Sequence, residues 1–192
     1  MEIARMIFPV TTLGPGNRLA LWTIGCSKHC EKCINPDLWE ADSTRNIPVE
    51  KLAKKITKVF ETNKVDGITI SGGDPLEQKA DFLELMNLLH PICQDILVYT
   101  GYTIREIQDS WQVADCKSLQ ENVGVLIDGQ YIHELNDNHC PLRGSQNQVI
   151  HYFDESLKEN YERYRKNNGR KLQSFHYSNG SVSVGIYKKG QD

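Results

Sequence analysis

The sequence predicts an α/β fold whose mainly parallel sheet closes only part of the way toward a barrel. Apolar strands alternate with helical segments of about a dozen residues, which is typical of βαβ units and a parallel sheet. The strands are short continuous apolar runs, as expected where both faces of a sheet are covered. Four such strands are too few for a complete eight-stranded barrel, so an open or partial barrel is expected.

The first predicted elements are two strands and a helix. Apolar runs over Ile3–Phe8 and Arg18–Ile24 predict the strands. A helix is expected to open at Ile47-Pro48-Val49-Glu50 and to end near Asn63. Its apolar face follows helical spacing and consists of Leu52, Ile56, Val59 and Phe60.

The central part of the chain continues the alternation. Gly67–Ile70 predicts a short buried strand, and Gln78–Leu89 predicts a helix with one apolar face. Ile96–Thr100 is a further strand, ended by Gly101.

One more helix and strand complete the predicted sheet region. Thr103 is a good N-cap for a helix over Ile104–Asp109, and Glu106 stands at the capping-box position. Val123–Ile127 predicts a strand that ends at Asp128-Gly129.

The C-terminal part has a different pattern. Val149–Phe153 predicts a strand, Glu155–Lys166 a polar helix, and 175–184 a hairpin, because Asn179-Gly180 suits a type I′ turn. We expect a partial-barrel domain over residues 1–153 and a C-terminal extension of helix plus hairpin over 154–192, whose role the sequence leaves open.

Composition limits the classes of function. The chain has 192 residues, 39% hydrophobic and 24% charged, which is ordinary for a globular domain. A net charge of −3 argues against general nucleic-acid binding. No apolar stretch is long enough to span a membrane, and the N-terminus lacks a signal peptide's apolar region. We therefore expect a cytoplasmic protein with reduced thiols and no membrane partner.

Three cysteines, Cys26, Cys30 and Cys33, lie within eight residues directly after the second predicted strand. Thiolates on so short a loop can converge on one metal centre. A closed zinc site or a fully ligated cubane requires four protein ligands. Three thiolates therefore favour a cluster with one open iron. A zinc knuckle and a structural cluster remain alternatives. The other cysteines are scattered and are expected to be small buried hydrophobes: Cys93, Cys116 and Cys140.

A second motif, Ser71-Gly72-Gly73-Asp74-Pro75, ends a predicted strand. Glycines there let the backbone approach a ligand closely, and the Asp74 carboxylate could accept a hydrogen bond from an ammonium group. The alternative is an ordinary tight turn. Together with Cys26, Gly101 and Asp128, the motif falls at the carboxyl ends of strands, where ligands of parallel α/β folds bind.

On these motifs the chain resembles the radical S-adenosylmethionine superfamily, and within it the activating enzymes of glycyl-radical proteins. The likeness covers roughly residues 1–150. It rests on these segments in this order: 25–33 with Asn35-Pro36 and Trp39, 71–76, 99–103, 126–131 and 142–148.

The resemblance implies a cofactor set and a reaction. Cys26, Cys30 and Cys33 would ligate a [4Fe–4S] cluster and be essential for catalysis. Gly72, Gly73 and Asp74 would hold the methionine moiety of S-adenosylmethionine, with Thr100 also at the cofactor. The reaction would abstract hydrogen from a glycine in the large subunit of an anaerobic (class III) ribonucleoside-triphosphate reductase. Flavodoxin or ferredoxin would donate the electron.

Other functions stay open at this point. They are activation of another glycyl-radical enzyme, radical chemistry on a small molecule such as a deazapurine precursor, a zinc-stabilised binding module, and a plain electron carrier. The last two need no cofactor cradle, and the glycine-rich motif argues against them.

Four further residues are candidates for cofactor or partner contacts. Asp128 ends a strand on the same rim, although a turn-forming Asp-Gly explains it equally well. The segment 143–148 is dense in hydrogen-bonding groups, and Arg143, Ser145 and Asn147 are its candidate cofactor ligands. A solvated loop is the alternative for this segment.

Overall fold

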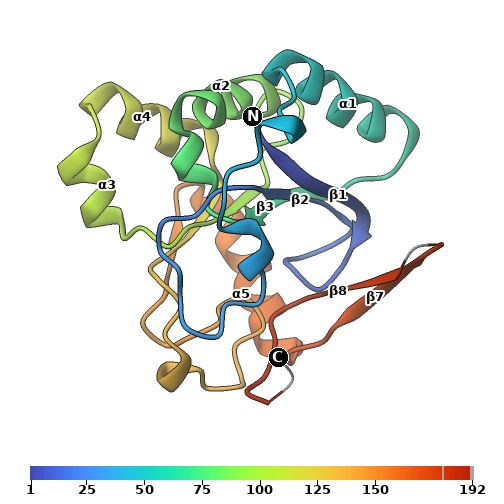
Figure 1. The fold of residues 1–192 in the computed structure, drawn as a ribbon, viewed down its shortest axis with the longest axis vertical. Helices are drawn as coiled ribbons and strands as arrows, with labels where there is room; N and C mark the ends of the chain where they lie inside the picture. Colours follow the sequence, from blue (N-terminus) through green and yellow to red (C-terminus); the bar gives the residue numbers. More distant parts are fainter. Residues whose placement is uncertain (179, 191–192) are drawn as a thin grey trace.

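The computed structural model describes residues 1–178 and 180–190, which form a mixed α/β fold around a six-stranded sheet (Figure 1). The strands follow one another in the sheet in chain order. The central four are parallel, and the first and the last pair antiparallel with their neighbours. The strands are β1 (Ile3–Val10), β2 (Arg18–Thr23), β3 (Gly67–Gly72), β4 (Ile96–Tyr99), β5 (Val125–Asp128) and β6 (Val149–Tyr152).

The helices and the C-terminal hairpin surround this sheet. The described residues form α1 (Val49–Thr62), α2 (Lys79–Leu89), α3 (Ile104–Ser110), α4 (Val113–Asn122) and α5 (Lys158–Asn167). Strands β7 (Gln173–Tyr177) and β8 (Gly180–Val184) make a separate antiparallel pair that projects from the body of the molecule (Figure 1). None of these helices is long and apolar enough to cross a membrane.

The main core lies between one face of the sheet and helices α1, α2 and α4. Alternate residues of each strand point to this face, so Leu19 and Leu21 of β2 meet Leu52 and Ile56 of α1. Phe82 of α2 lies in the same cluster and is fully buried. These helices occupy the upper part of Figure 1. The burial of this face explains why the apolar runs appear as βαβ units in the sequence.

Helix α5 covers part of the opposite face. Its Tyr161 is fully buried and donates a hydrogen bond to Asp95 at 2.6 Å. The carboxylate of Asp95 also receives two hydrogen bonds from the buried guanidinium of Arg18, at 3.0 Å each. Removing one partner of a buried ion pair costs on the order of 3–5 kcal/mol. The hydrogen bond from Tyr161 therefore connects the C-terminal extension to this buried pair of the sheet domain.

The predicted strands and helices are confirmed, with ends shifted by up to three residues. The largest shift is in the helix predicted from Glu155, which begins as a 3-10 turn over Glu155–Leu157 and continues as α5 from Lys158. The capping box of α3 is present, with Thr103 and Glu106 bonding each other's backbone. Helix α4 was not predicted, because among its residues only Leu119 is fully buried and no apolar stripe marks it. The predicted hairpin is present on both sides of Asn179, which itself lies outside the described residues.

Candidate functional site

The cysteine loop leaves the sheet at the end of β2 and returns beside its own start. The backbone N–H groups of Gly25 and Cys26 donate to the carbonyls of Leu38 and Trp39, each at 2.9 Å. These two bonds close residues 25–39 into one compact loop. Inside it, the N–H of Cys33 donates to the carbonyl of Cys30 at 3.1 Å. A tight turn therefore joins two of the three cysteines.

Two non-glycine residues of this loop adopt left-handed backbone conformations, His29 with φ 44° and Lys32 with φ 57°. Such values are uncommon for non-glycine residues and are tolerated where surrounding contacts fix the chain. The His29 ring stacks on Trp39, with the ring centroids 4.7 Å apart. The stack holds the imidazole against the returning end of the loop, which gives His29 a structural part.

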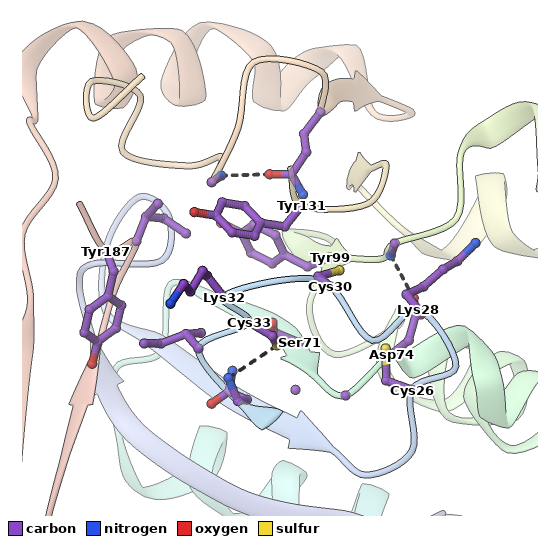
Figure 2. A pocket seen from close by; sticks show the side chains of 18 of the residues that line it. Cys26, Lys28, Cys30, Lys32, Cys33, Ser71, Asp74, Tyr99, Tyr131 and Tyr187 are labelled. Carbon is purple, nitrogen blue, oxygen red and sulfur yellow. Dashed lines mark hydrogen bonds between the residues drawn. The ribbon is translucent and has the colours of Figure 1, made fainter. Parts of the chain in front are cut away.

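The three cysteines line one pocket at the carboxyl ends of the parallel strands (Figure 2). The pocket has a volume of about 1060 Å³, including the part open to solvent. Cys26, Cys30 and Cys33 are partly exposed and carry free thiols. The Gly72-Gly73-Asp74 motif and Thr100 line the same pocket. The parallel order of β2 to β5 is what brings these separate segments to one edge.

The donor set fits an iron–sulfur cluster better than one metal ion. Among the residues that the structure describes, no three His, Cys, Asp or Glu side chains converge closely enough to hold a single ion. A cubane presents a separate iron to each thiolate, so its ligands need not meet at one point. Burial raises the pKa of the Cys26 and Cys30 thiols. Both are therefore protonated at neutral pH, and ligation must displace their protons.

The two glycines of the second motif are required by close packing. Gly72 has φ +122°, and a Cβ there would clash with the backbone N and O of Thr23. A Cβ on Gly73 would clash with the carbonyl oxygen of Gly25. The N–H groups of Gly73 and Asp74 donate to Thr23 and Gly25, at 2.9 and 2.7 Å. The motif thus fastens the end of β3 to the start of the cysteine loop.

Asp74 is buried beneath the pocket, with 1% of its surface exposed. Its carboxylate accepts from the N–H of Leu76 at 3.0 Å and from the N–H of Gly101 at 2.7 Å. It also accepts from the Thr100 hydroxyl. Burial nevertheless raises the pKa of Asp74 to about 6. A cationic ligand group placed beside this carboxylate would favour its charged form.

Asp128 ends β5 but does not line the pocket. Its carboxylate accepts from the N–H of Ile104 at 2.6 Å and from the N–H of Val149 at 3.3 Å. His151 Nε2 lies 3.1 Å from the same carboxylate, without the alignment of a hydrogen bond. Asp128 therefore joins α3 and β6 to the end of β5. A direct contact with cofactor or partner stays a prediction.

The candidates in segment 143–148 lie behind the pocket wall. Arg143 donates to the carbonyls of Gln146 and Gln148 at 3.3 Å each, and Asn147 donates to the carbonyl of Gln130 at 2.7 Å. Ser145 is fully buried and accepts from the N–H of Ile132 at 3.1 Å. The residues of this segment that line the pocket are Gly144 and Gln148. Cofactor binding by the three candidates stays a prediction.

Several lining residues were not singled out from the sequence. Tyr99 ends β4 and Tyr131 follows β5, both beside Cys30 in Figure 2. Both tyrosines lie in segments that carry the resemblance, 99–103 and 126–131, and this was the available signal. The larger omission is the segment 185–189, which returns from the C-terminal hairpin to line the pocket. Nothing in its sequence marks this return.

Three cysteines and a glycine-rich strand end at one pocket are the features of an iron–sulfur protein. A family model described as "4Fe-4S single cluster domain" matches residues 12–151, which places the cysteine loop and the strands β2 to β5 within the matched part. The class of site defined by the geometry and the class of the family model therefore agree.

Similar proteins with known names identify a family within the class of iron–sulfur proteins. An anaerobic ribonucleoside-triphosphate reductase-activating protein of Vibrio cholerae is 36% identical over 152 residues, which is 76% of this chain and 95% of the relative. Proteins of the same name from Escherichia coli and Enterobacteria phage T4 are 34% and 32% identical, with 96% and 85% of their own lengths covered. This chain belongs to the family of anaerobic ribonucleoside-triphosphate reductase-activating proteins.

Proposed function

We propose that this protein is a radical S-adenosylmethionine enzyme that generates a glycyl radical on an anaerobic ribonucleoside-triphosphate reductase. The observation that carries the proposal is the meeting of the cysteine loop and the Gly72-Gly73-Asp74 motif at one pocket. Family membership names the partner class, because the relatives are named as activating proteins of that reductase.

Cys26, Cys30 and Cys33 would hold a [4Fe–4S] cluster and leave one iron for S-adenosylmethionine. When bound, the cluster and S-adenosylmethionine together supply a carbon-centred radical that takes a hydrogen atom from a glycine of the reductase. The matched family model supports the presence of a 4Fe–4S cluster. We also propose that the sheet and its helices form a partial β/α barrel of the radical S-adenosylmethionine type, which positions the cofactor.

The chain's own residues then position and shield the cofactor. Gly72 and Gly73 let the end of β3 pack directly against the backbone of Thr23 and Gly25, which holds the motif beside the cysteine loop. Asp74 supplies negative charge below that place, held by Thr100 and Gly101. A buried carboxylate with a raised pKa gains most from a neighbouring cation, and S-adenosylmethionine carries both a sulfonium and an ammonium group.

The reaction requires reduced thiols and an external electron. All six cysteines are free in the structure, as a cluster-binding protein needs. We therefore place the protein in the reducing cytoplasm, with a flavodoxin or ferredoxin as electron donor.

Anaerobic reconstitution with iron and sulfide, followed by reduction and addition of S-adenosylmethionine and reductase, tests the proposal. We expect 5′-deoxyadenosine together with a glycyl radical signal in the electron paramagnetic resonance spectrum. The signal should appear only when the reductase is present. Zinc without iron, or turnover of a small substrate with no protein partner, would contradict the proposal.

A further inference from the structure

The C-terminal extension contributes a wall to the pocket. Residues Gly185, Ile186, Tyr187, Lys188 and Lys189 line it together with the cysteine loop. Figure 2 shows Tyr187 beside Lys32, on the side of the view away from Cys26 and Asp74. The family match ends at residue 151, before α5, so this wall lies outside the matched part.

Contacts with the sheet domain fix the path of the extension toward the pocket. The Tyr164 hydroxyl of α5 donates to the carbonyl of Thr11 at 3.0 Å. The Thr12 hydroxyl donates to the carbonyl of Val184 at 2.8 Å, and Val184 is buried in the cluster that contains Trp22. At the next residue, Gly185, a Cβ would clash with the carbonyl oxygen of Lys171. The chain therefore enters the pocket rim from a closely packed hairpin base.

Arg170 connects this segment to the opposite loop. Its Nη1 donates to the Tyr187 carbonyl at 2.7 Å and to Asn136 Oδ1 at 2.6 Å. Its Nε donates to the Cys140 carbonyl at 2.9 Å, and Nη2 donates to the Arg143 carbonyl at 2.8 Å. One guanidinium thus bonds to both the C-terminal segment and the 136–144 loop.

The Arg170 side chain is 1% exposed, and Asp137 Oδ1 lies 3.3 Å from Nη2 as its carboxylate partner. A buried guanidinium is stable only where its donors find acceptors, and its planar fork can serve several acceptors at once. Asn136 and Gly144 of the bonded loop also line the pocket. Arg170 therefore joins two parts of the pocket wall.

We propose that Arg170 is a positioning residue that holds residues 185–189 against the 136–144 loop, so that the extension restricts access of small molecules to the reacting centre. The inference rests on the proposed radical function. An alkyl radical takes a hydrogen atom from most C–H and S–H donors. A closed wall on this side therefore directs the radical to the substrate that enters by the remaining opening.

The chemistry defines two outcomes for the radical. In the coupled path the glycine Cα–H bond breaks, the hydrogen atom completes the methyl group of 5′-deoxyadenosine, and the unpaired electron stays on glycine. In the uncoupled path a thiol reductant gives the hydrogen atom and becomes a thiyl radical. Thiol hydrogens exchange with D₂O, so the uncoupled path places deuterium in the product.

The first measurement uses the protein without cluster. Hydrogen–deuterium exchange is compared among the unsubstituted protein, Arg170→Gln, Arg170→Lys and the control Arg163→Gln. Arg163 lies on α5 with 63% of its side chain exposed, and its guanidinium pairs with Glu159 at 2.9 Å. We expect at least tenfold faster exchange in 136–144 and 184–189 for Arg170→Gln, a smaller effect for Arg170→Lys, and no change for Arg163→Gln.

The second measurement uses the reconstituted enzyme with reductase and dithiothreitol in D₂O. We expect Arg170→Gln to raise the deuterated fraction of 5′-deoxyadenosine at least fivefold and to lower the glycyl radical formed per 5′-deoxyadenosine. Arg163→Gln should match the unsubstituted enzyme. If thermal unfolding shows that Arg170→Gln does not fold, both measurements are made on Arg170→Lys instead.

Two results would overturn the inference. One is unchanged exchange in both segments of a folded Arg170 variant. The other is faster exchange with an unchanged deuterated fraction, since the wall would then restrict nothing. Failure of the proposed function is distinguishable, because the unsubstituted enzyme would itself form no glycyl radical, whereas the exchange measurement does not depend on that reaction.

Discussion

The hydroxyl of Thr100 donates to the buried carboxylate of Asp74, at 2.9 Å from Oδ1 and 3.0 Å from Oδ2. The contact joins the end of β4 to the motif that follows β3, directly below the pocket. It links two residues, Asp74 and Thr100, that the resemblance predicts to lie at the cofactor.

Thr100→Val removes this hydroxyl while keeping the shape of the side chain. A hydrogen bond to a charged group contributes about 1.5–3 kcal/mol, so we expect S-adenosylmethionine to bind at least about tenfold more weakly. Isothermal titration of the anaerobically reconstituted protein measures this affinity. Thr100→Ser retains the donor and should bind S-adenosylmethionine with the affinity of the unsubstituted protein. If Thr100→Val also binds it with that affinity, the hydrogen bond from Thr100 to Asp74 does not contribute to the cofactor site.

Asp74 should leave a signature in the pH dependence of stability. Its folded pKa is about 6 against an ordinary 3.8, so the folded state binds the proton more tightly. Its contribution to the free energy of unfolding is therefore greatest in acid and is lost as pH rises through 6. Relative to Asp74→Asn, the cluster-free protein should lose about 2 kcal/mol between pH 4 and pH 7.

Urea unfolding of both proteins across this pH range measures the difference. The comparison cancels the other titrating groups, because they are common to both proteins. A difference that stays constant with pH would mean that Asp74 has an ordinary pKa.

Replacement of any one of Cys26, Cys30 and Cys33 by alanine should abolish 5′-deoxyadenosine formation. Three thiolates are the fewest that hold a cubane with one open iron, so two leave it unstable. Iron content and the spin-resonance spectrum of the reduced protein report the loss directly. Cys116→Ala is the control, because Cys116 lies outside the pocket and packs against the main core. If one of these cysteine variants still cleaves S-adenosylmethionine, the replaced cysteine is not a ligand of the cluster.

Gly72→Ala should destabilise the fold by about 2 kcal/mol or more. The new Cβ meets the Thr23 backbone, and φ +122° is unfavourable for alanine. Gly169→Ala is a matched control, since a Cβ there meets no atom within 4 Å. Chemical unfolding of the cluster-free Gly72→Ala and Gly169→Ala proteins measures the free energy of unfolding of each. Equal stability of the two variants would mean that β3 can move away from β2 at little cost.

The sequence alone determined the alternation of strands and helices along the chain and the place of the cysteine loop. These features depend on local signals: apolar runs of strand length, helix caps such as Thr103, and thiol spacing. Parallel pairing then requires that the strand ends share one edge, so Cys26, Gly72 and Asp74 were predicted to meet, and the structure places all three at one pocket.

Tertiary structure alone decided which loop residues face that pocket. In segment 143–148 the lining residues are Gly144 and Gln148, whereas Arg143, Ser145 and Asn147 bond to neighbouring backbone. An irregular loop has no fixed side-chain period, so its sequence does not reveal which residues point inward. The return of residues 185–189 was equally hidden, because the contact of Arg170 with Asn136 spans 34 residues and depends on how α5 packs under the sheet.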